Sequence, residues 1–509
     1  MKQKAFQERS LTIREKALGP DHPDVAESLT NVASLFESQG RRAEAETLYK
    51  RSLAIREKQL GRDHPRTAQS LSNLAALAYH QGEWVEAATH WRLSIAAIKR
   101  RSERGLTEAR PTEGSFGREA RGHAAGFRGF IRAAYRIAVQ GPSPVTMMLA
   151  SETFETAQWV QGSEAAVSLA QMAVRSAQGS PQLAQLVRER QDLVSEWEMK
   201  DKQLMAAKSD APAKRKADGE GALGNRLADI DRRLEGIDGR LANNFPNYTA
   251  LASPAPVSVT EVQAQLRADE ALVLFLDVPA LKPTRQETFI WVVTKSDMRW
   301  VRSELGTAAL AREVTALRCG LDGAAWFDNG AEQCSKLLEV SSALGSNPLL
   351  PFDHARAHKL YVALFGEVQD LVAGKHLLIV PSGPLTQLPF QVLITKQPTS
   401  SDHREAAWLA REHAITVLPA VSSLKALRRI GKSSAATKPM IGFGNPLLNG
   451  PDPSYAHHAQ LAREKERCNA RPQRRVALAD LLESPVQIVR FSAPRLSTRR
   501  GAPQSASKS

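Results

Sequence analysis

The chain has 509 residues, of which 42% are hydrophobic, enough for about three domains with buried cores. Its net charge of +14 favours acidic partners or nonspecific polyanion binding, but no nucleic-acid-binding motif accompanies the scattered basic clusters. The N-terminus MKQKAFQERS is polar, the apolar runs are short, and three cysteines show no disulfide framework or metal spacing, which together predict a cytoplasmic protein without a membrane span, metal or cofactor.

Residues 11–40 recur 42 positions later, because LTIREKALGPDHPDVAESLTNVASLFESQG is followed by LAIREKQLGRDHPRTAQSLSNLAALAYHQG. A fixed period of this length is typical of stacked helical hairpins. The spacing predicts first helices at 24–39 and 66–81, second helices at 43–60 and 85–100, and a lone second helix at 3–18. The turns GPDHPD and GRDHPR combine a glycine stop, a proline and an aspartate that we expect to cap the next helix.

This unit resembles the tetratricopeptide repeat, in its 42-residue kinesin-light-chain-like form, over residues 1–100. The resemblance implies an α-solenoid of about two and a half units whose concave groove binds a protein or peptide. Asn31 and Asn73 recur at one repeat position, where they either hydrogen-bond an extended peptide backbone or only tie adjacent helices together. The neighbouring first-helix residues expected to set side-chain preference are Ser34, Glu37, Ala76 and His80.

The middle of the chain is predicted to be helical. Polar residues 101–126 are interpreted as a linker, and helical spacing returns across 127–250. Within that region, residues 183–243 are expected to form an antiparallel hairpin with a disordered tip near 206–224. Its seam has apolar residues at steps of three and four, namely Leu227, Ile230, Leu234, Ile237 and Leu241.

From 251 to 450 short apolar runs alternate with helical segments, which predicts an α/β domain. The expected strands are 271–278, 287–293, 298–301, 376–380, 414–418 and 439–443. The expected helical stretches are 307–318, 331–344, 353–372 and 421–430. Because helical connections usually return a chain to the same sheet, the last three strands should be adjacent and parallel.

The stretch HLLIVPSGPLTQLPFQVLIT (376–395), followed by AITVLPAVSSLKAL and MIGFGNPLL, resembles the CHAT domain, a caspase- and separase-like peptidase family. The resemblance implies a cysteine endopeptidase, which requires a thiolate, a histidine base and backbone donors for the oxyanion. In that family a His-Gly pair ends one strand and a cysteine ends the next, both after the region matching MIGFGNPLL.

Residues 450–509 contain neither pattern. Cys468 lies in the charged stretch LAREKERCNAR, His413 begins a strand, and His457 and His458 are followed by Ala-Gln. Cys319 and Cys334 lie in helical stretches and are expected to be buried or half-buried. We therefore assign no catalytic residue.

The resulting prediction is a bacterial protein with a repeat solenoid, a helical hairpin region, a truncated and inactive caspase-like α/β domain, and an irregular basic tail at 451–509. The alternatives are an active peptidase that uses Cys468 with a nearby histidine, and a basic polyanion-binding protein.

Overall fold

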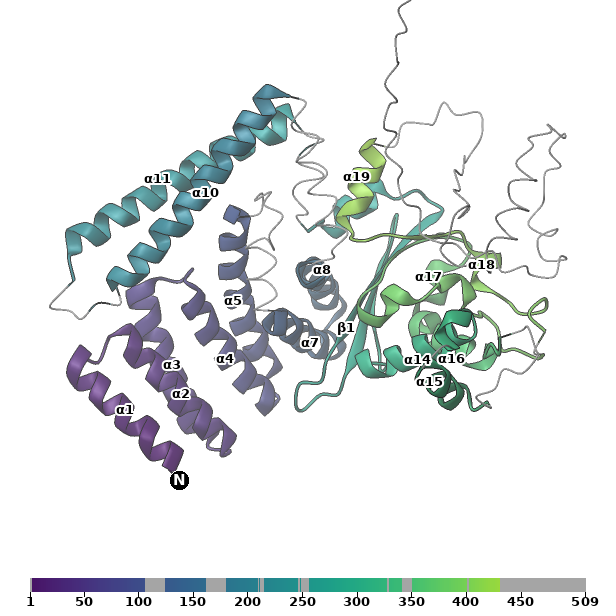
Figure 1. The fold of residues 1–509 in the computed structure, drawn as a ribbon, viewed down its shortest axis with the longest axis horizontal. Coiled ribbons are helices and arrows are strands. Elements are labelled where there is room, and N and C mark those ends of the chain that lie inside the picture. The colour runs from purple at the N-terminus through teal and green to yellow at the C-terminus, as the bar shows by residue number, and fades with distance from the viewer. Residues whose placement is uncertain are drawn as a thin grey trace, which may run out of the picture. The chain divides into compact units, whose positions relative to one another are not determined.

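The structure is a computed structural model, and its arrangement is drawn in Figure 1. The residues that it describes are 2–105, 124–161, 180–208, 210, 215–245, 248, 256–326, 329–340, 350–400 and 402–430. Apart from 402–404, these residues belong to one compact unit. The strand expected at 439–443, the tail from 451 and residues His457, His458 and Cys468 lie outside the described residues.

The predicted repeat helices are confirmed. They are α1 (Lys2–Leu18), α2 (Pro23–Ser38), α3 (Arg42–Leu60), α4 (Pro65–Gln81) and α5 (Trp84–Gly105). Ala33, Ala45, Ala75 and Ala87 are fully buried, so that neighbouring helices approach closely. Ser52 on α3 donates 2.8 Å to the carbonyl of Ala26, and its counterpart Ser94 donates 2.8 Å to the carbonyl of Ala68. The two hairpins therefore close with the same contact in the same register.

The caps of the two first helices differ from the prediction. His22 and His64, not the preceding aspartates, accept the backbone N–H of Asp24 and Arg66 through Nδ1, at 3.1 and 3.0 Å. The histidine stands directly before the proline that opens each helix, where a cap must lie, and the aspartate is one position too early. Those aspartates instead form ion pairs with the second helices, Asp21 with Lys58 and Asp63 with Arg100.

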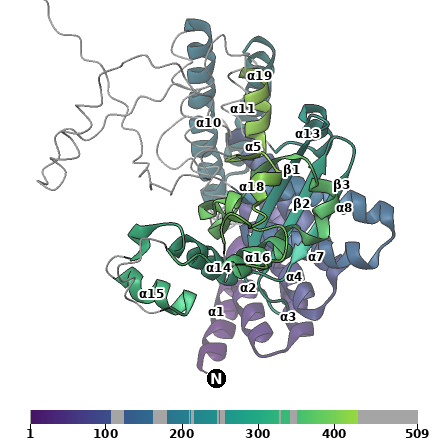
Figure 2. The same ribbon diagram turned by 90° about the vertical axis from the view of Figure 1, so that its right-hand side faces the viewer.

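The central helices are α7 (Ala124–Gln140), α8 (Ser143–Val160), α10 (Pro181–Lys208) and α11 (Ala217–Asn244). Helices α10 and α11 lie side by side, as Figures 1 and 2 show. The predicted seam residues of α11 are buried between them. The residues at 101–105 and 124–126, expected in a linker, are helical. So are 206–208 and 217–224, expected in a disordered tip, where Arg215 pairs with Glu220 at 2.7 Å.

Within the described residues the sheet has five strands, in the order β3-β2-β1-β4-β5. They are β1 (Glu270–Val278), β2 (Glu287–Thr294), β3 (Met298–Ser303), β4 (His376–Val380) and β5 (Ile415–Val417). Strand β1 is antiparallel to β2 and parallel to β4, with Leu274 opposite Val380, and β4 is parallel to β5. The prediction that 376–380 and 414–418 are adjacent and parallel is confirmed.

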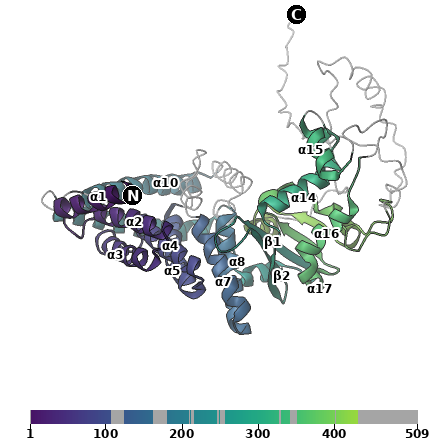
Figure 3. The same ribbon diagram turned by 90° about the horizontal axis from the view of Figure 1, so that it is seen from below.

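Helices cover both faces of the sheet, which is why β1 is apolar at nearly every position. Ala271, Val273 and Phe275 face α14 (Thr307–Cys319), α16 (His354–Phe365) and α17 (Gln369–Val372). The alternate residues of β1 face α7, α8, α13 (Val259–Gln265) and α19 (Ser422–Ile430), and Figure 3 shows the two layers. The other elements in the described ranges are α15 (Asn329–Leu338), α18 (Leu409–Glu412) and the 3-10 helices Gly323–Trp326, Gly366–Val368, Gly383–Gln387 and Phe390–Val392.

A buried ion pair joins α7 to the sheet. Arg132 and Glu287 are each 1% exposed, and Arg132 Nε donates 3.0 Å to Glu287 Oε1. Arg136 and Arg302 contact the other oxygen at 2.9 and 3.2 Å. Burial lowers the pKa of Arg132, and its guanidinium also donates to backbone carbonyls at the β1–β2 connection, including that of Pro279. The buried negative charge of Glu287 is thus compensated by the guanidinium groups around it.

Removing one partner of this cluster should lower the stability of the folded protein. Glu287→Ala leaves Arg132 buried without its carboxylate, so we expect the free energy of unfolding of the sheet region to fall by about 3–5 kcal/mol. Urea titration followed by tryptophan fluorescence measures the change. The control is Glu46→Ala, which breaks the exposed pair with Lys50 and should cost less than about 0.5 kcal/mol. An equal fall in the free energy of unfolding in the two variants would contradict the structural role of the buried pair.

Candidate functional site

The six residues predicted to bind a peptide lie on α2 and α4 with different exposure. Asn31 and Ser34 on α2 are exposed, whereas Asn73 and Ala76 on α4 are half-buried. The amide oxygen of Asn73 accepts 2.9 Å from Gln69 Nε2, one turn earlier on the same helix. The two asparagines therefore share a repeat position but not an environment, and Asn73 contacts its own helix in the structure.

Glu37 and His80, the other two predicted residues, meet at the junction of the two units. His80 Nδ1 lies 2.9 Å from Glu37 Oε1, and the hydroxyl of Tyr49 donates 3.1 Å to Glu37 Oε2. Burial raises the pKa of Tyr49, and the adjacent Glu37 raises it further. Because both carboxylate oxygens of Glu37 already have partners, this trio stabilises the contact of α2, α3 and α4. Tyr49 was not predicted for this cluster, because it lies on a second helix and its contact is set by packing.

A polar cluster lies where β1 and β4 end. Ser382 Oγ donates 2.7 Å to Asp277 Oδ1 and accepts the backbone N–H of Asp277 at 2.9 Å. Thr307 Oγ1 donates 2.7 Å to the other carboxylate oxygen. Gly383 follows with φ +47°, and a Cβ there would lie 2.5 Å from Asp277 Oδ1, so only glycine fits.

This cluster lies at the Ser-Gly-Pro turn of residues 382–384, which follows β4. The hydroxyl proton of Ser382 points to a carboxylate that also receives Thr307, and the serine is 8% exposed. The arrangement fixes the chain between two parallel strands. Activating a serine as a nucleophile would also require a base, commonly a histidine, that takes the hydroxyl proton as the oxygen attacks a substrate.

The histidines of the strands lie at the opposite edge of the sheet. His413 precedes β5, is buried, and its Nδ1 lies 2.8 Å from the carbonyl of Lys375. His376 opens β4 and its Nε2 lies 2.8 Å from Thr416 Oγ1. Parallel strands have their amino ends at one edge and their carboxyl ends at the other, so neither histidine reaches the cluster at Asp277 and Ser382.

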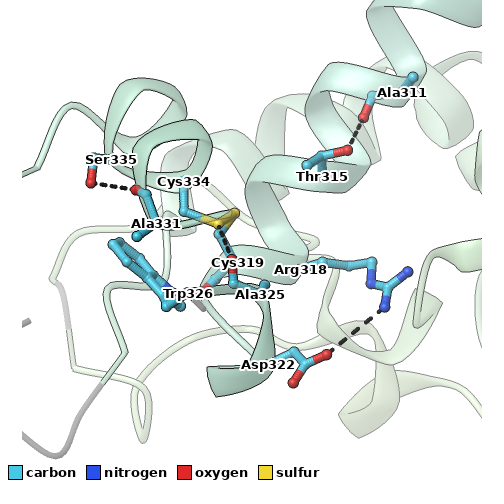
Figure 4. The surroundings of a disulfide bond; sticks show 10 residues. All are labelled: Ala311, Thr315, Arg318, Cys319, Asp322, Ala325, Trp326, Ala331, Cys334 and Ser335. Carbon is cyan, nitrogen blue, oxygen red and sulfur yellow. Dashed lines mark hydrogen bonds and ion pairs between the residues drawn. A yellow bond between two sulfur atoms is a disulfide. The ribbon is translucent and has the colours of Figure 1, made fainter. Parts of the chain in front are cut away.

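Cys319 and Cys334 form a disulfide, so the prediction that the cysteines have no disulfide framework is wrong for this pair (Figure 4). Their Cα atoms are 5.6 Å apart, and the closed loop spans 15 positions. Trp326 packs beside the bond and its Nε1 donates 2.7 Å to the carbonyl of Cys319. The pairing depends on how α14 meets α15, which spacing along the sequence does not reveal.

The described residues include neither a cluster of metal-ligating side chains nor a helix that could span a membrane. Within those ranges, His, Cys, Asp and Glu side chains form no group of three or more that could hold a metal ion. The helices that the structure describes include none that is long and apolar enough to cross a membrane.

Comparison with known families agrees with the resemblances seen in the sequence. The family model described as Tetratricopeptide repeat matches residues 4–58 and 37–100, and the model described as CHAT domain matches residues 354–495. The CHAT match covers α16, β4, α18, β5 and α19 and continues past residue 450. No curated protein matches the chain.

The disulfide predicts how many thiols can react. In denaturant without reductant, an alkylating reagent should label Cys468 alone, because Cys319 and Cys334 are joined. After reduction all three cysteines should be labelled. Mass spectrometry of the digested protein counts the modified residues, and Cys468→Ser is the control that should remove all labelling before reduction. Labelling of Cys319 or Cys334 in protein that was never reduced would contradict the bond.

Proposed function

We propose that this chain, which carries tetratricopeptide repeats followed by a CHAT domain, binds a protein or peptide through the first helices of its repeats and does not cleave peptides. The observation that carries the binding proposal is the repeated architecture itself. Two hairpins close through the same serine–carbonyl contact, which supports a rigid scaffold, and the polar residues Asn31 and Ser34 remain exposed on α2. Stacked helical units of this kind present extended binding surfaces.

The peptidase part of the proposal rests on chemistry. A cysteine peptidase needs a free thiol beside a histidine, and the resemblance to the CHAT family implies that both stand at the ends of strands. Among the described residues, Cys319 and Cys334 are joined to each other, and His413 lies at the amino edge of the sheet. The remaining thiol, Cys468, has charged neighbours and no apolar strand before it in the sequence.

One observation favours the alternative of an active cysteine endopeptidase. The CHAT match extends to residue 495, and so includes Cys468, His457 and His458. The net charge of +14 keeps polyanion binding as a third possibility. The peptidase alternative predicts cleavage of peptides, and the polyanion alternative predicts binding that falls steeply as ionic strength rises. Groove binding by an inactive protein predicts neither.

The absence of peptidase activity can be tested with a degenerate peptide library. The purified full-length chain should release no cleavage products by mass spectrometry, and a thiol-directed peptide probe should not label Cys468 faster than it labels denatured protein. The control is Cys468→Ser, whose product profile should match that of the wild type. Rapid labelling of Cys468 that is lost on replacing His413, His457 or His458 would establish the alternative.

Groove binding can be tested with a peptide selected on the wild-type chain by phage display. Asn31→Ala together with Asn73→Ala should weaken its binding roughly tenfold to thirtyfold, because two hydrogen bonds of about 1 kcal/mol each are lost. Fluorescence anisotropy measures the affinity, and circular dichroism should show unchanged helix content. The control is Asn243→Ala, an exposed asparagine on α11.

Salt separates this proposal from polyanion binding. Binding driven by charge falls steeply as ionic strength rises, whereas binding through hydrogen bonds and apolar contacts persists. An affinity that the double variant does not change, or that disappears at high salt, would place the interaction elsewhere on the chain.

A further inference from the structure

The two repeat units differ in charge and polarity at the turn between their first and second helices. Residues 41–44 read Arg-Arg-Ala-Glu, whereas the equivalent residues 83–86 read Glu-Trp-Val-Glu. The glycine that precedes each turn, Gly40 or Gly82, has positive φ, at +77° and +84°. The backbone of the turn is therefore similar in the two units, while its charge and polarity are not.

In the first unit this turn contains its own cation. Arg41 Nε donates 2.6 Å to Glu44 Oε1, and a second guanidinium nitrogen contacts the other carboxylate oxygen. The guanidinium also lies 3.9 Å from the centre of the Phe36 ring. Arg41 thus lies against both a carboxylate and an aromatic face, an arrangement that favours a cation electrostatically.

In the second unit the cation is replaced by a second carboxylate. Hydrogen bonding to Glu86 raises the pKa of Glu83, and the nearby charge of Glu46 raises it further. Lys50 acts in the opposite direction but is already paired with Glu46 at 2.5 Å. His90 Nε2 lies 3.5 Å from Glu86 Oε1. Two acidic groups therefore share the position where the first unit has an ion pair.

An apolar hollow adjoins these carboxylates. It has a volume of about 630 Å³, and its walls are residues 82–86 together with Ile137, Gln140 and Gly141 at the end of α7. Val85 is 67% exposed. The Trp84 ring packs edge-on against Tyr79, with centroids 4.9 Å apart, so the tryptophan is held in place.

We propose that this hollow, which we name the turn pocket, binds a partner peptide in which an apolar side chain stands next to a lysine or arginine. The cation would neutralise Glu83 and Glu86 beside Trp84, as Arg41 does for Glu44 beside Phe36. The apolar side chain would cover Val85 and Ile137. The occupant is argued from charge complementarity and from the first unit, where the chain supplies the cation itself. The turn pocket shares no residue with the six first-helix residues, so it does not depend on the proposed groove.

The first unit also supplies substitutions that the fold already tolerates. Glu83→Arg recreates the ion pair of Arg41 with Glu44, and Val85→Ala recreates Ala43. The probe is a fluorescein-labelled hexapeptide of alternating lysine and leucine, titrated against the full-length chain and followed by anisotropy. Each substitution should weaken its binding about tenfold or more, since each removes an interaction worth about 1.4 kcal/mol. Circular dichroism should show unchanged helix content.

Two further peptides define the chemistry of the ligand. Alternating lysine and serine lacks the apolar side chain, and alternating glutamate and leucine lacks the cation, so both should bind at least about tenfold more weakly. The variant with Asn31→Ala and Asn73→Ala should bind the lysine–leucine peptide as the wild type does, which separates failure here from failure of the proposed groove. No binding of that peptide, equal binding of the serine peptide, or unchanged binding by Glu83→Arg would overturn the turn pocket.

Discussion

The closing contact of each helical hairpin is the constraint on which the repeat region depends. A serine on the second helix donates to a carbonyl on the first, and this contact recurs from Ser52 and Ala26 to Ser94 and Ala68. The small buried residues Ala33 and Ala75 allow that approach. Once this contact is fixed, the faces turned toward solvent are free to differ between units. Differences between equivalent positions, such as Arg41 and Glu83, are therefore where we propose that the two units differ in binding.

A second constraint fastens the repeats to the sheet. The buried pair of Arg132 with Glu287 holds α7 against β2, and the hydroxyl of Tyr79 on α4 lies 2.8 Å from Thr284 Oγ1 in the β1–β2 connection. Because an unpaired charge in such a place is costly, the pair favours one packing of α7 on the strands. At the same end of β1, Asp277 and Ser382 hold the turn that leaves β4.

The sequence predicted most of the helices and strands, because their apolar spacing is local and strong. The repeat helices, the seam of the α10–α11 hairpin and strands β1 to β5 all follow from such spacing. What it did not predict depends on contacts between distant residues or on single positions. The sequence pattern assigned the helix caps to aspartates, whereas the caps are His22 and His64, one residue further along the chain.

The candidate sites also combine features that the sequence pattern identified with features that depend on contacts between distant residues. Repetition identified α2 and α4 as the helices of interest, but it could not show that Glu37 and His80 face each other beside Tyr49. The disulfide between Cys319 and Cys334 requires that α14 and α15 meet, which no spacing reveals.

The central claim is that this chain acts by binding through its repeats. Hydrogen–deuterium exchange of the full-length chain, with and without a peptide selected on it, tests this directly, because bound backbone regions exchange more slowly. The account predicts protection in α2, α4 and the turn at 82–86, and little change in β4, β5 and the turn at Ser382. Protection concentrated at the carboxyl ends of β1 and β4, with the repeats unchanged, would contradict it.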